Sequence, residues 1–186
     1  MVQSIADRHQ NSSSTTSDLP ESIDIAIVGA GPQALTLATH LLQKKKSMQE
    51  RFVVLDPAGE WMQQWHHQFA AMDITHLRSP AVHHPDPNPH ALRAFAAGRA
   101  SELFPPYDLP GTSLFRTFCN HTIQRWGLAE KVISARVVNI EHHRSAWRKH
   151  RFRLVMADGR SMYARRVVVA MGGGPPHLPD WVSRIA

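Results

Sequence analysis

The apolar residues between positions 22 and 56 form two short blocks separated by a stretch with helical spacing. Ser22–Val28 (SIDIAIV) is a β-branched run that stops at a glycine, which is typical of a buried parallel strand. Within residues 35–42 leucine and alanine recur at helical spacing, and the stretch ends at three lysines, 44–46. Phe52–Asp56 (FVVLD) has the pattern of a second buried strand. The predicted order is therefore strand, tight glycine turn, helix and strand.

The last third of the chain has the pattern of a hairpin followed by another strand. Residues 152–156 and 161–164 flank the sequence ADGR, and an Asp-Gly pair between two such runs predicts a β-hairpin. Residues 166–170 (RVVVA) predict a further buried strand, which runs into a stretch rich in glycine and proline. These elements together indicate an α/β, Rossmann-like fold with a parallel sheet and a small antiparallel β excursion.

The middle of the chain alternates between helical patterns and loops. Proline-punctuated loops at 83–89 and 104–110 flank a short helical pattern at 91–97. Such loops carry substrate contacts in many proteins and are plain connectors in others. Residues 115–126 are predicted to form an amphipathic helix that contains Cys119, which we expect to be a buried, unreactive thiol.

Length and composition limit the domain organisation and the location of the protein. With 186 residues the chain is long enough for one medium domain and too short for two of full size. Residues 1–20 are rich in Ser and Thr and lack an apolar block, which predicts a disordered tail ahead of a domain at 21–186. No apolar run approaches the roughly 20 residues of a membrane span, so we expect no membrane association. The single cysteine suits a reducing compartment, which makes the cytoplasm the expected location.

Neither the positive charge nor the histidines predict a further kind of site. The formal net charge is +6, but the basic residues cluster only at 44–46 and 144–153, without an aromatic-basic motif, so nucleic-acid binding is not expected. The 13 histidines include adjacent pairs at 66–67 and 83–84, whose side chains point in different directions, and no chelating spacing accompanies them. We therefore expect no metal site.

The glycine turn after the first strand carries the most specific chemistry. Gly29, Gly31 and Ala34 form a G-x-G-x-x-A pattern that follows a strand and opens a helix, and Asp56 ends the next strand. In such a turn the first glycine permits the sharp bend, and the second lets the backbone approach a pyrophosphate at the helix N-terminus. Asp56 is expected to accept hydrogen bonds from a ribose. The alternatives are a Rossmann-like turn without a ligand and a turn-forming role for Asp56 ahead of Pro57.

Further motifs narrow the class of protein. The glycine turn, a V-x-x-I-E strand at 137–141, the Asp-Gly hairpin and the closing VVVA-x-G-x-x-P together resemble the FAD-binding portion of flavoproteins with two dinucleotide domains. Within these, the chain is most similar to lysine and ornithine N-monooxygenases, flavin-containing monooxygenases and the oxidative-stress-induced growth inhibitors. The resemblance covers most of residues 24–179.

The resemblance implies roles for individual residues in binding FAD. Val138 would offer backbone hydrogen bonds to the adenine, and the segment from Ala170 to Gly173 would approach the flavin, with Met171 where the motif usually has Thr. Trp61 or Trp65 would flank the isoalloxazine ring, or both are core residues. Arg78 suits a phosphate or carboxylate of FAD, NADPH or an acidic substrate, or a surface ion pair. The predicted cofactor-binding residues are Gly29, Gly31, Pro32, Gln33, Ala34, Asp56, Trp61, Trp65, Arg78, Val138, Ala170, Gly172 and Gly173.

The resemblance also implies what this chain lacks. Relatives carry a second glycine fingerprint, for NADPH, after the closing G-x-x-P motif, and this chain ends at Ala186. We therefore expect the FAD-binding domain of a flavin-dependent, NADPH-linked oxidoreductase of the N-hydroxylating monooxygenase type, with its C-terminal half absent or on another chain. Its substrate would be a small amine or an amino-acid-like molecule, and no catalytic residue is identified. A non-catalytic, nucleotide-binding regulatory protein is the alternative.

Overall fold

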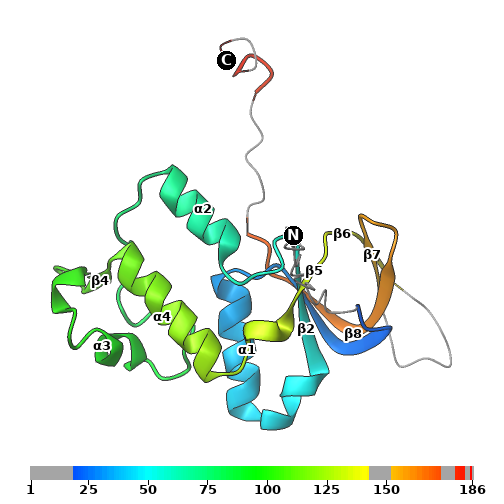
Figure 1. Cartoon of the computed structure of the whole chain (residues 1–186), viewed down its shortest axis with the longest axis horizontal. Helices are drawn as coiled ribbons and strands as arrows, with labels where there is room; N and C mark the ends of the chain where they lie inside the picture. Colours follow the sequence, from blue (N-terminus) through cyan, green and yellow to red (C-terminus); the bar gives the residue numbers. More distant parts are fainter. Residues whose placement is uncertain (1–18, 143–151, 173–178, 183–184, 186) are drawn as a thin grey trace, which may run out of the picture.

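The computed structural model describes residues 19–142, 152–172, 179–182 and 185 (Figure 1). None of the helices within these residues is long and apolar enough to cross a membrane. The strands are β1 (Ser22–Val28), β2 (Phe52–Asp56), β3 (Leu103–Phe104), β4 (Leu109–Pro110), β5 (Val132–Ser134), β6 (Val137–His142), β7 (Phe152–Met156) and β8 (Ser161–Val169). The α-helices are α1 (Pro32–Lys44), α2 (Gln63–Ala71), α3 (Ala91–Phe95) and α4 (Thr112–Arg125).

Six strands form one sheet in the order β5-β2-β1-β8-β7-β6. The first four of these strands are mutually parallel, and β1 in the middle pairs with β2 on one side and with β8 on the other. The last three strands form an antiparallel meander, in which β7 pairs with both β6 and β8. The parallel part and the antiparallel excursion confirm the α/β, Rossmann-like fold class, and β3 and β4 add a separate two-stranded sheet.

The two outer strands of the large sheet follow one another in the sequence. Only Ala135 and Arg136, here named the connector, separate β5 from β6. The connector is held on both sides, because the Ala135 N–H donates to the Asp56 carbonyl (3.1 Å) and the Ala157 N–H donates to the Arg136 carbonyl (2.8 Å). The sheet therefore curls so that the meander packs over β1, β2 and β5. A cluster of buried side chains fills the curl: Ala26, Val28, Leu55, Ile133, Ala135, Leu154, Met156, Met162 and Ala164.

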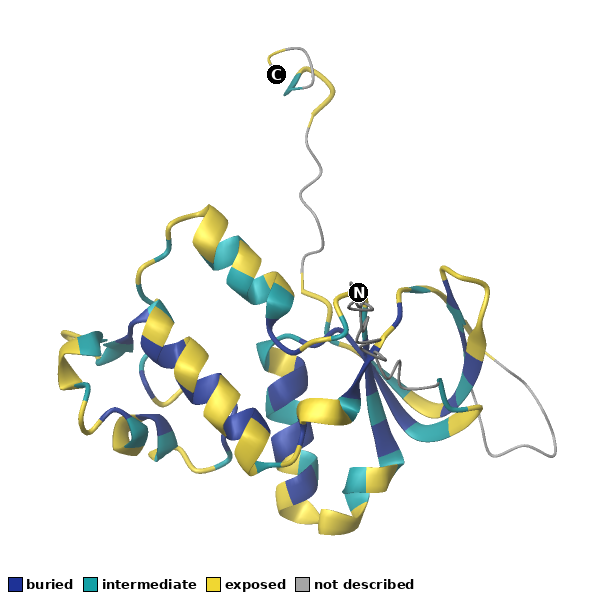
Figure 2. Cartoon of the chain, in the orientation of Figure 1, coloured by how far each residue is buried: buried dark blue, intermediate teal, exposed yellow. Residues whose placement is uncertain are grey.

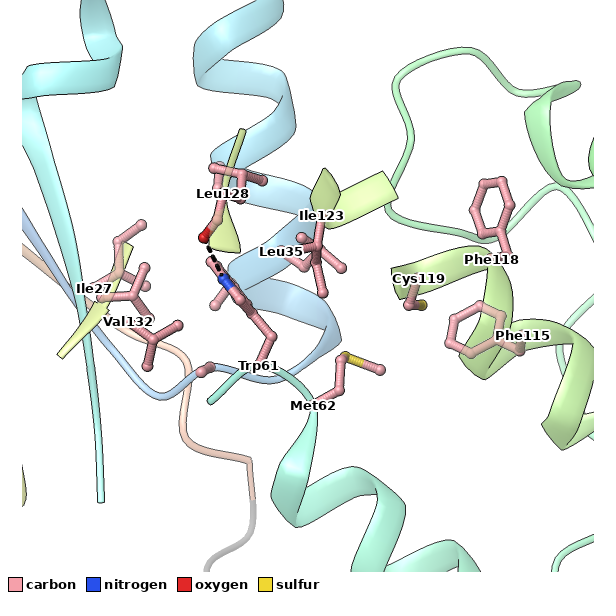
Figure 3. Close-up of a cluster of buried hydrophobic side chains, with 14 of the residues drawn as sticks. Ile27, Leu35, Trp61, Met62, Phe115, Phe118, Cys119, Ile123, Leu128 and Val132 are labelled. Carbon is pink, nitrogen blue, oxygen red and sulfur yellow. Dashed lines mark hydrogen bonds between the residues drawn. The ribbon is translucent and has the colours of Figure 1, made fainter. Parts of the chain in front are cut away.

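A second, larger core lies between the other face of the sheet and the helices. Helix α1 begins with Pro32 in its first turn, where proline suits a helix, and buries Leu35, Ala38 and Leu42. Figure 1 shows α1 between the sheet and the layer of α3 and α4. Helix α4 contributes Phe118 and Cys119 to the same core (Figure 3). Burial raises the pKa of the Cys119 thiol, which confirms the expected buried position and keeps the thiol protonated.

The predicted elements near the glycine turn are confirmed. The observed β1 and β2 have the predicted bounds, and α1 ends at Lys44 as expected. The hairpin around Asp158 and Gly159 and the helix at Cys119 are also present. Of the predicted tail, residues 1–18 lie outside the described residues, while Leu19 packs against the core inside the curl.

Two features of the last strand were predicted wrongly. Residues 161–164 and 166–170 were expected to form separate strands, but Ser161–Val169 is one continuous strand, whose first part (161–164) pairs with β7 and whose residues 163–169 pair with β1. The second part of this strand is also not buried, since Val169 is 61% exposed. A valine run fits a buried strand and an exposed one equally well, because pattern alone does not tell which faces are covered.

Candidate dinucleotide-binding site

Gly29 is a glycine because two backbone segments meet there. Its N–H donates to the Leu55 carbonyl (2.8 Å), and the Ala170 N–H donates to the Val28 carbonyl (2.7 Å), so the turn lies where β1 and its two neighbours end. The φ angle of Gly29 is +101°, and a Cβ atom would lie 2.6 Å from the Ala170 carbonyl oxygen. Both the backbone angle and the contact exclude a side chain. The protein itself therefore requires this glycine.

Gly31 has no such reason within the protein. Its φ angle is −84°, which any residue adopts, and a Cβ atom would meet nothing nearer than Gln33 Oε1, at 3.8 Å. Gly31 precedes the first turn of α1, and no side chain caps the helix N-terminus. The free N–H groups of a helix N-terminus and the helix dipole favour an anion. The space kept clear by Gly31 thus fits the phosphate group that the sequence pattern predicts.

Asp56 ties the glycine turn to the end of β2. One carboxylate oxygen accepts a hydrogen bond from the Ala30 N–H (3.0 Å) and the other from the Ala58 N–H (2.9 Å). This is the turn-forming role that the sequence left open. Each carboxylate oxygen has a further lone pair, so the same side chain retains the capacity to accept hydrogen bonds from a ribose.

A hollow of about 470 Å³, here named the strand-end hollow, lies at the carboxyl ends of β1 and β2, and Gly29 and Asp56 are among the residues that line it. Its volume is in the range of small-molecule sites, and such sites in parallel sheets lie at this end of the strands. The residues that line it are Val28, Gly29, Leu55, Asp56, Pro57, Ala58, Gln63, Gln64, His67, Ala135, Arg136, Val137 and Met171.

Two parts of the strand-end hollow were not predicted. Helix α2 contributes Gln63, Gln64 and His67, of which Gln63 and His67 are four residues apart and so lie on one helical face. The connector contributes the second part. Within the described residues, neither the Arg136 N–H nor the Ala135 carbonyl has a hydrogen-bond partner. The helical spacing of the polar residues Gln63 and His67 could have indicated the contribution of α2. No sequence pattern indicates the contribution of the connector.

The other predicted cofactor-binding residues are not all brought together. Trp61 is buried, and its indole N–H donates to the Leu128 carbonyl (2.8 Å; Figure 3), so it has the core role that the sequence allowed. Trp65 is half-buried and stacks on Phe69, with ring centroids 3.9 Å apart, outside the strand-end hollow. Val138 is 59% exposed and lies next to the lining residue Val137.

The remaining predicted positions are not among the residues that line the hollow, and one of them lies outside the described residues. Ala34 is fully buried in α1, and Pro32 and Gln33 form the first turn of that helix. Arg78 is exposed and forms no ion pair or side-chain hydrogen bond within the described part of the chain. Ala170 and Gly172 follow β8, and Gly172 has a φ of +68° with open space where a Cβ would lie. Gly173 lies outside the described residues.

We expect Asp56→Asn to lower both the stability of the protein and its affinity for a nucleotide. An asparagine has one acceptor oxygen, so one of the two backbone N–H groups would face an NH₂ donor, at a cost of about 1–3 kcal/mol. Urea unfolding measures the stability and calorimetry the affinity. The control is Asp158→Asn in the exposed β7–β8 turn, where the carboxylate also accepts a backbone hydrogen bond (3.0 Å). If Asp56→Asn lowers the free energy of unfolding no more than the control does, the two hydrogen bonds of Asp56 do not stabilise the turn.

Comparisons with known proteins agree with this geometry. Residues 26–174 match the family described as FAD-NAD(P)-binding. No curated protein matches the chain. Among solved structures, the flavin-containing monooxygenase from Stenotrophomonas maltophilia is 22% identical, with a TM-score of 0.53, over 87% of this chain and 42% of that one.

Two amine-related monooxygenases have the same fold. The FAD-bound cadaverine monooxygenase of desferrioxamine biosynthesis from Erwinia amylovora has a TM-score of 0.56 at 16% identity, over 81% of this chain and 36% of that one. The lysine monooxygenase from Nocardia farcinica has a TM-score of 0.55 at 14% identity, over 81% of this chain and 54% of that one. At these identities the likeness is one of fold, and the chain spans about half or less of each structure.

Proposed function

This chain belongs to the FAD-NAD(P)-binding family, and from that premise we propose that it is the FAD-binding part of a flavin-dependent, NADPH-linked oxidoreductase of the N-hydroxylating monooxygenase type. The observation that carries the proposal is Gly31, which leaves clear space at the N-terminus of α1 for no reason internal to the protein. Monooxygenases of cadaverine and of lysine share the fold, which supports a small amine or an amino-acid-like substrate.

We assign a different part of FAD to each group of residues in and beside the strand-end hollow. The pyrophosphate would lie against the N-terminus of α1, in the space beside Gly31. Asp56 would accept hydrogen bonds from the adenosine ribose. The unpaired Arg136 N–H is a free donor at the edge of the hollow and would donate to a ring nitrogen of the adenine. In this proposal the connector has the adenine-binding role that the resemblance implied for the neighbouring Val138.

Bound flavin would supply the redox chemistry, while the chain binds and orients it and excludes water. Met171 and the Gln63, Gln64 and His67 side chains of α2 line the strand-end hollow together with the connector, where they would contact and orient a ligand. Within the described residues, the proposed role of the chain is thus to hold and position the cofactor.

The direct test is the absorption spectrum of the purified protein. We expect flavin absorption at about 450 nm in near-stoichiometric amount after reconstitution with FAD. Protein that has the native fold by circular dichroism and takes up no FAD would overturn the proposal. Because the similar structures are longer than this chain, amine-dependent NADPH oxidation is expected of an assembly that supplies a second nucleotide-binding part. An assembly that retains FAD but hydroxylates no amine would overturn the reaction class and leave FAD binding intact.

We expect the protein to bind ADP more tightly than 2′-phospho-ADP. The Asp56 carboxylate would lie beside the ribose, and a 2′-phosphate there would be repelled by the like charge. Arg136 lines the same hollow, and its positive charge would attract a 2′-phosphate. The ratio of the two affinities therefore tells whether the Asp56 carboxylate or the Arg136 guanidinium lies beside the ribose. Calorimetric titration of both nucleotides, repeated with Arg136→Gln, decides between them. Equal affinities in the unaltered protein would count against the ribose role of Asp56.

A further inference from the structure

Helix α2 separates two hollows. Its Gln63, Gln64 and His67 side chains line the strand-end hollow, and its opposite side lines a second hollow of about 280 Å³ that reaches α4. Figure 2 shows α2 without a buried residue, in contrast to α1 and α4. We name the second space the α2–α4 hollow. The residues that line it are Trp65, His66, Phe69, Ala70, Asp73, Ile74, Thr75, Thr112, Ser113 and Arg116.

One wall of the α2–α4 hollow is aromatic. Trp65 and Phe69 lie one helical turn apart on α2 and stack at 27° with ring centroids 3.9 Å apart. Phe115 of α4 lies behind Trp65, with centroids 5.4 Å apart, and fixes the indole from the core side. A preformed aromatic face of this kind packs well against a planar apolar group.

The α4 side of the hollow is positively polarised. Ser113 and Arg116 come from the first two turns of α4, whose N-terminus has no side-chain cap. The Thr112 hydroxyl is already used, since it donates to the Ile74 carbonyl (2.6 Å), which leaves Ser113 and Arg116 for a ligand. Arg116 forms no ion pair within the described part of the chain. The helix N-terminus and the guanidinium together favour an anion.

His66 supplies an independent sign of a missing partner. Its Nε2 atom is buried, and within the described residues this is the buried side-chain polar atom that no hydrogen bond satisfies. Burial, followed by the charges of Arg116 and His67, lowers the pKa of His66, so the imidazole is neutral near pH 7. Buried polar atoms in native proteins nearly always have a partner, so an unsatisfied one beside a hollow points to a ligand.

From these observations we propose that the α2–α4 hollow binds a small aromatic carboxylate. Its ring would pack against the wall of Trp65 and Phe69, and its carboxylate would contact Arg116, Ser113 and the Nε2 atom of His66. Asp73 is the one carboxylate in the lining and opposes an anion, but the same lining holds the Arg116 guanidinium and the first turn of α4, which have the opposite sign. The site lies on the other side of α2 from the strand-end hollow and does not depend on the proposed FAD binding.

The test uses three benzene derivatives of similar size and different charge on the whole chain. Calorimetric titration with benzoate, benzamide and benzylamine is expected to give the tightest binding for benzoate, at least about tenfold tighter than benzamide because its hydrogen bonds are charge-assisted. Equal binding of benzoate and benzamide, or no binding of benzoate at millimolar concentration, would overturn the proposal. Tighter binding of benzylamine would assign the hollow to cations through Asp73 and overturn it as well.

Three variants separate a ligand site from a structural feature. Arg116→Gln is expected to remove the preference for benzoate over benzamide, while Arg136→Gln in the strand-end hollow leaves it unchanged. His66→Phe is expected to weaken benzoate binding without lowering the thermal midpoint, because it removes an unsatisfied buried atom. Retained benzoate preference in Arg116→Gln would refute the assigned contact.

A competition experiment separates this proposal from FAD binding. Saturating ADP is expected to leave benzoate binding unchanged, and failure of ADP to bind would affect only the proposed function. Displacement of benzoate by riboflavin would instead assign the α2–α4 hollow to a flavin ring and overturn the carboxylate proposal.

Discussion

Gly31→Val is expected to abolish FAD retention while leaving the fold intact. The added side chain would occupy the space at the N-terminus of α1 where the pyrophosphate is proposed to lie, and a branched residue cannot be moved aside there without rebuilding the turn. The protein itself offers no obstacle, because the nearest atom to a Cβ is Gln33 Oε1 at 3.8 Å. We expect at least about a hundredfold loss of FAD affinity, which corresponds to about 3 kcal/mol. Flavin absorbance after gel filtration, together with a urea unfolding curve, measures both effects.

Two further variants make this experiment specific. Gly31→Ala adds a single methyl group and is expected to lose less FAD than Gly31→Val. Gly98→Val places the same side chain at a glycine with nothing within 4 Å of a Cβ, far from the hollow in sequence, and should retain FAD fully. Stoichiometric FAD on folded Gly31→Val protein would show that the turn does not hold the phosphate.

Gly29→Ala is expected to cost the protein a large part of its stability. The φ angle of +101° strains any residue with a side chain, and the new methyl group would lie 2.6 Å from the Ala170 carbonyl oxygen and 2.9 Å from the Met171 Cα. Neither atom is the end of a flexible side chain, so β1 and the end of β8 would have to separate. We expect a loss of about 4 kcal/mol or more in the free energy of unfolding, out of the 5–15 kcal/mol typical of a domain. Urea unfolding followed by circular dichroism measures it.

Gly159→Ala is the matched control for the backbone angle. Gly159 has a φ of +86° in the β7–β8 turn, and a Cβ there would meet nothing within 4 Å. It therefore reports the cost of a positive φ alone, about 1–2 kcal/mol. The difference between the two variants is the cost of the close approach to Ala170. Losses of equal size would show that no such contact exists in solution.

The local part of the site was predictable from the sequence. The β-branched run before Gly29, the helical spacing after Gly31 and the acid at Asp56 lie within 35 residues, and each element is specified by its own pattern. Strands β1 and β2 pair directly with each other, and α1 connects them, so the conformation of the glycine turn between β1 and α1 is restricted. For this reason the bounds of β1, β2 and α1 agree with the prediction.

The rest of the site depends on contacts that no local pattern records. Trp61 and Trp65 lie four residues apart, and what makes Trp61 a core residue is the Leu128 carbonyl, 67 residues away. Helix α2 was not predicted because none of its residues is buried, which removes the apolar stripe by which helices are recognised. The connector was missed because its unpaired groups belong to the backbone, whose partners depend on how the meander lies against β5.

The central position of β1 has a consequence for the synthesis of the protein. Of the six strands of the large sheet, β1 is the first to leave the ribosome, and β2 follows it within a few seconds at ordinary translation rates. Its other neighbour, β8, with which it pairs from Ser22 to Val28, is the last of the six strands of this sheet in the sequence. Until then β1 has one open edge of apolar residues, the kind of surface that chaperones bind and that other nascent chains pair with. The sheet is thus completed only after its other five strands have been synthesised, and a product that stops before β8 cannot close the core around β1.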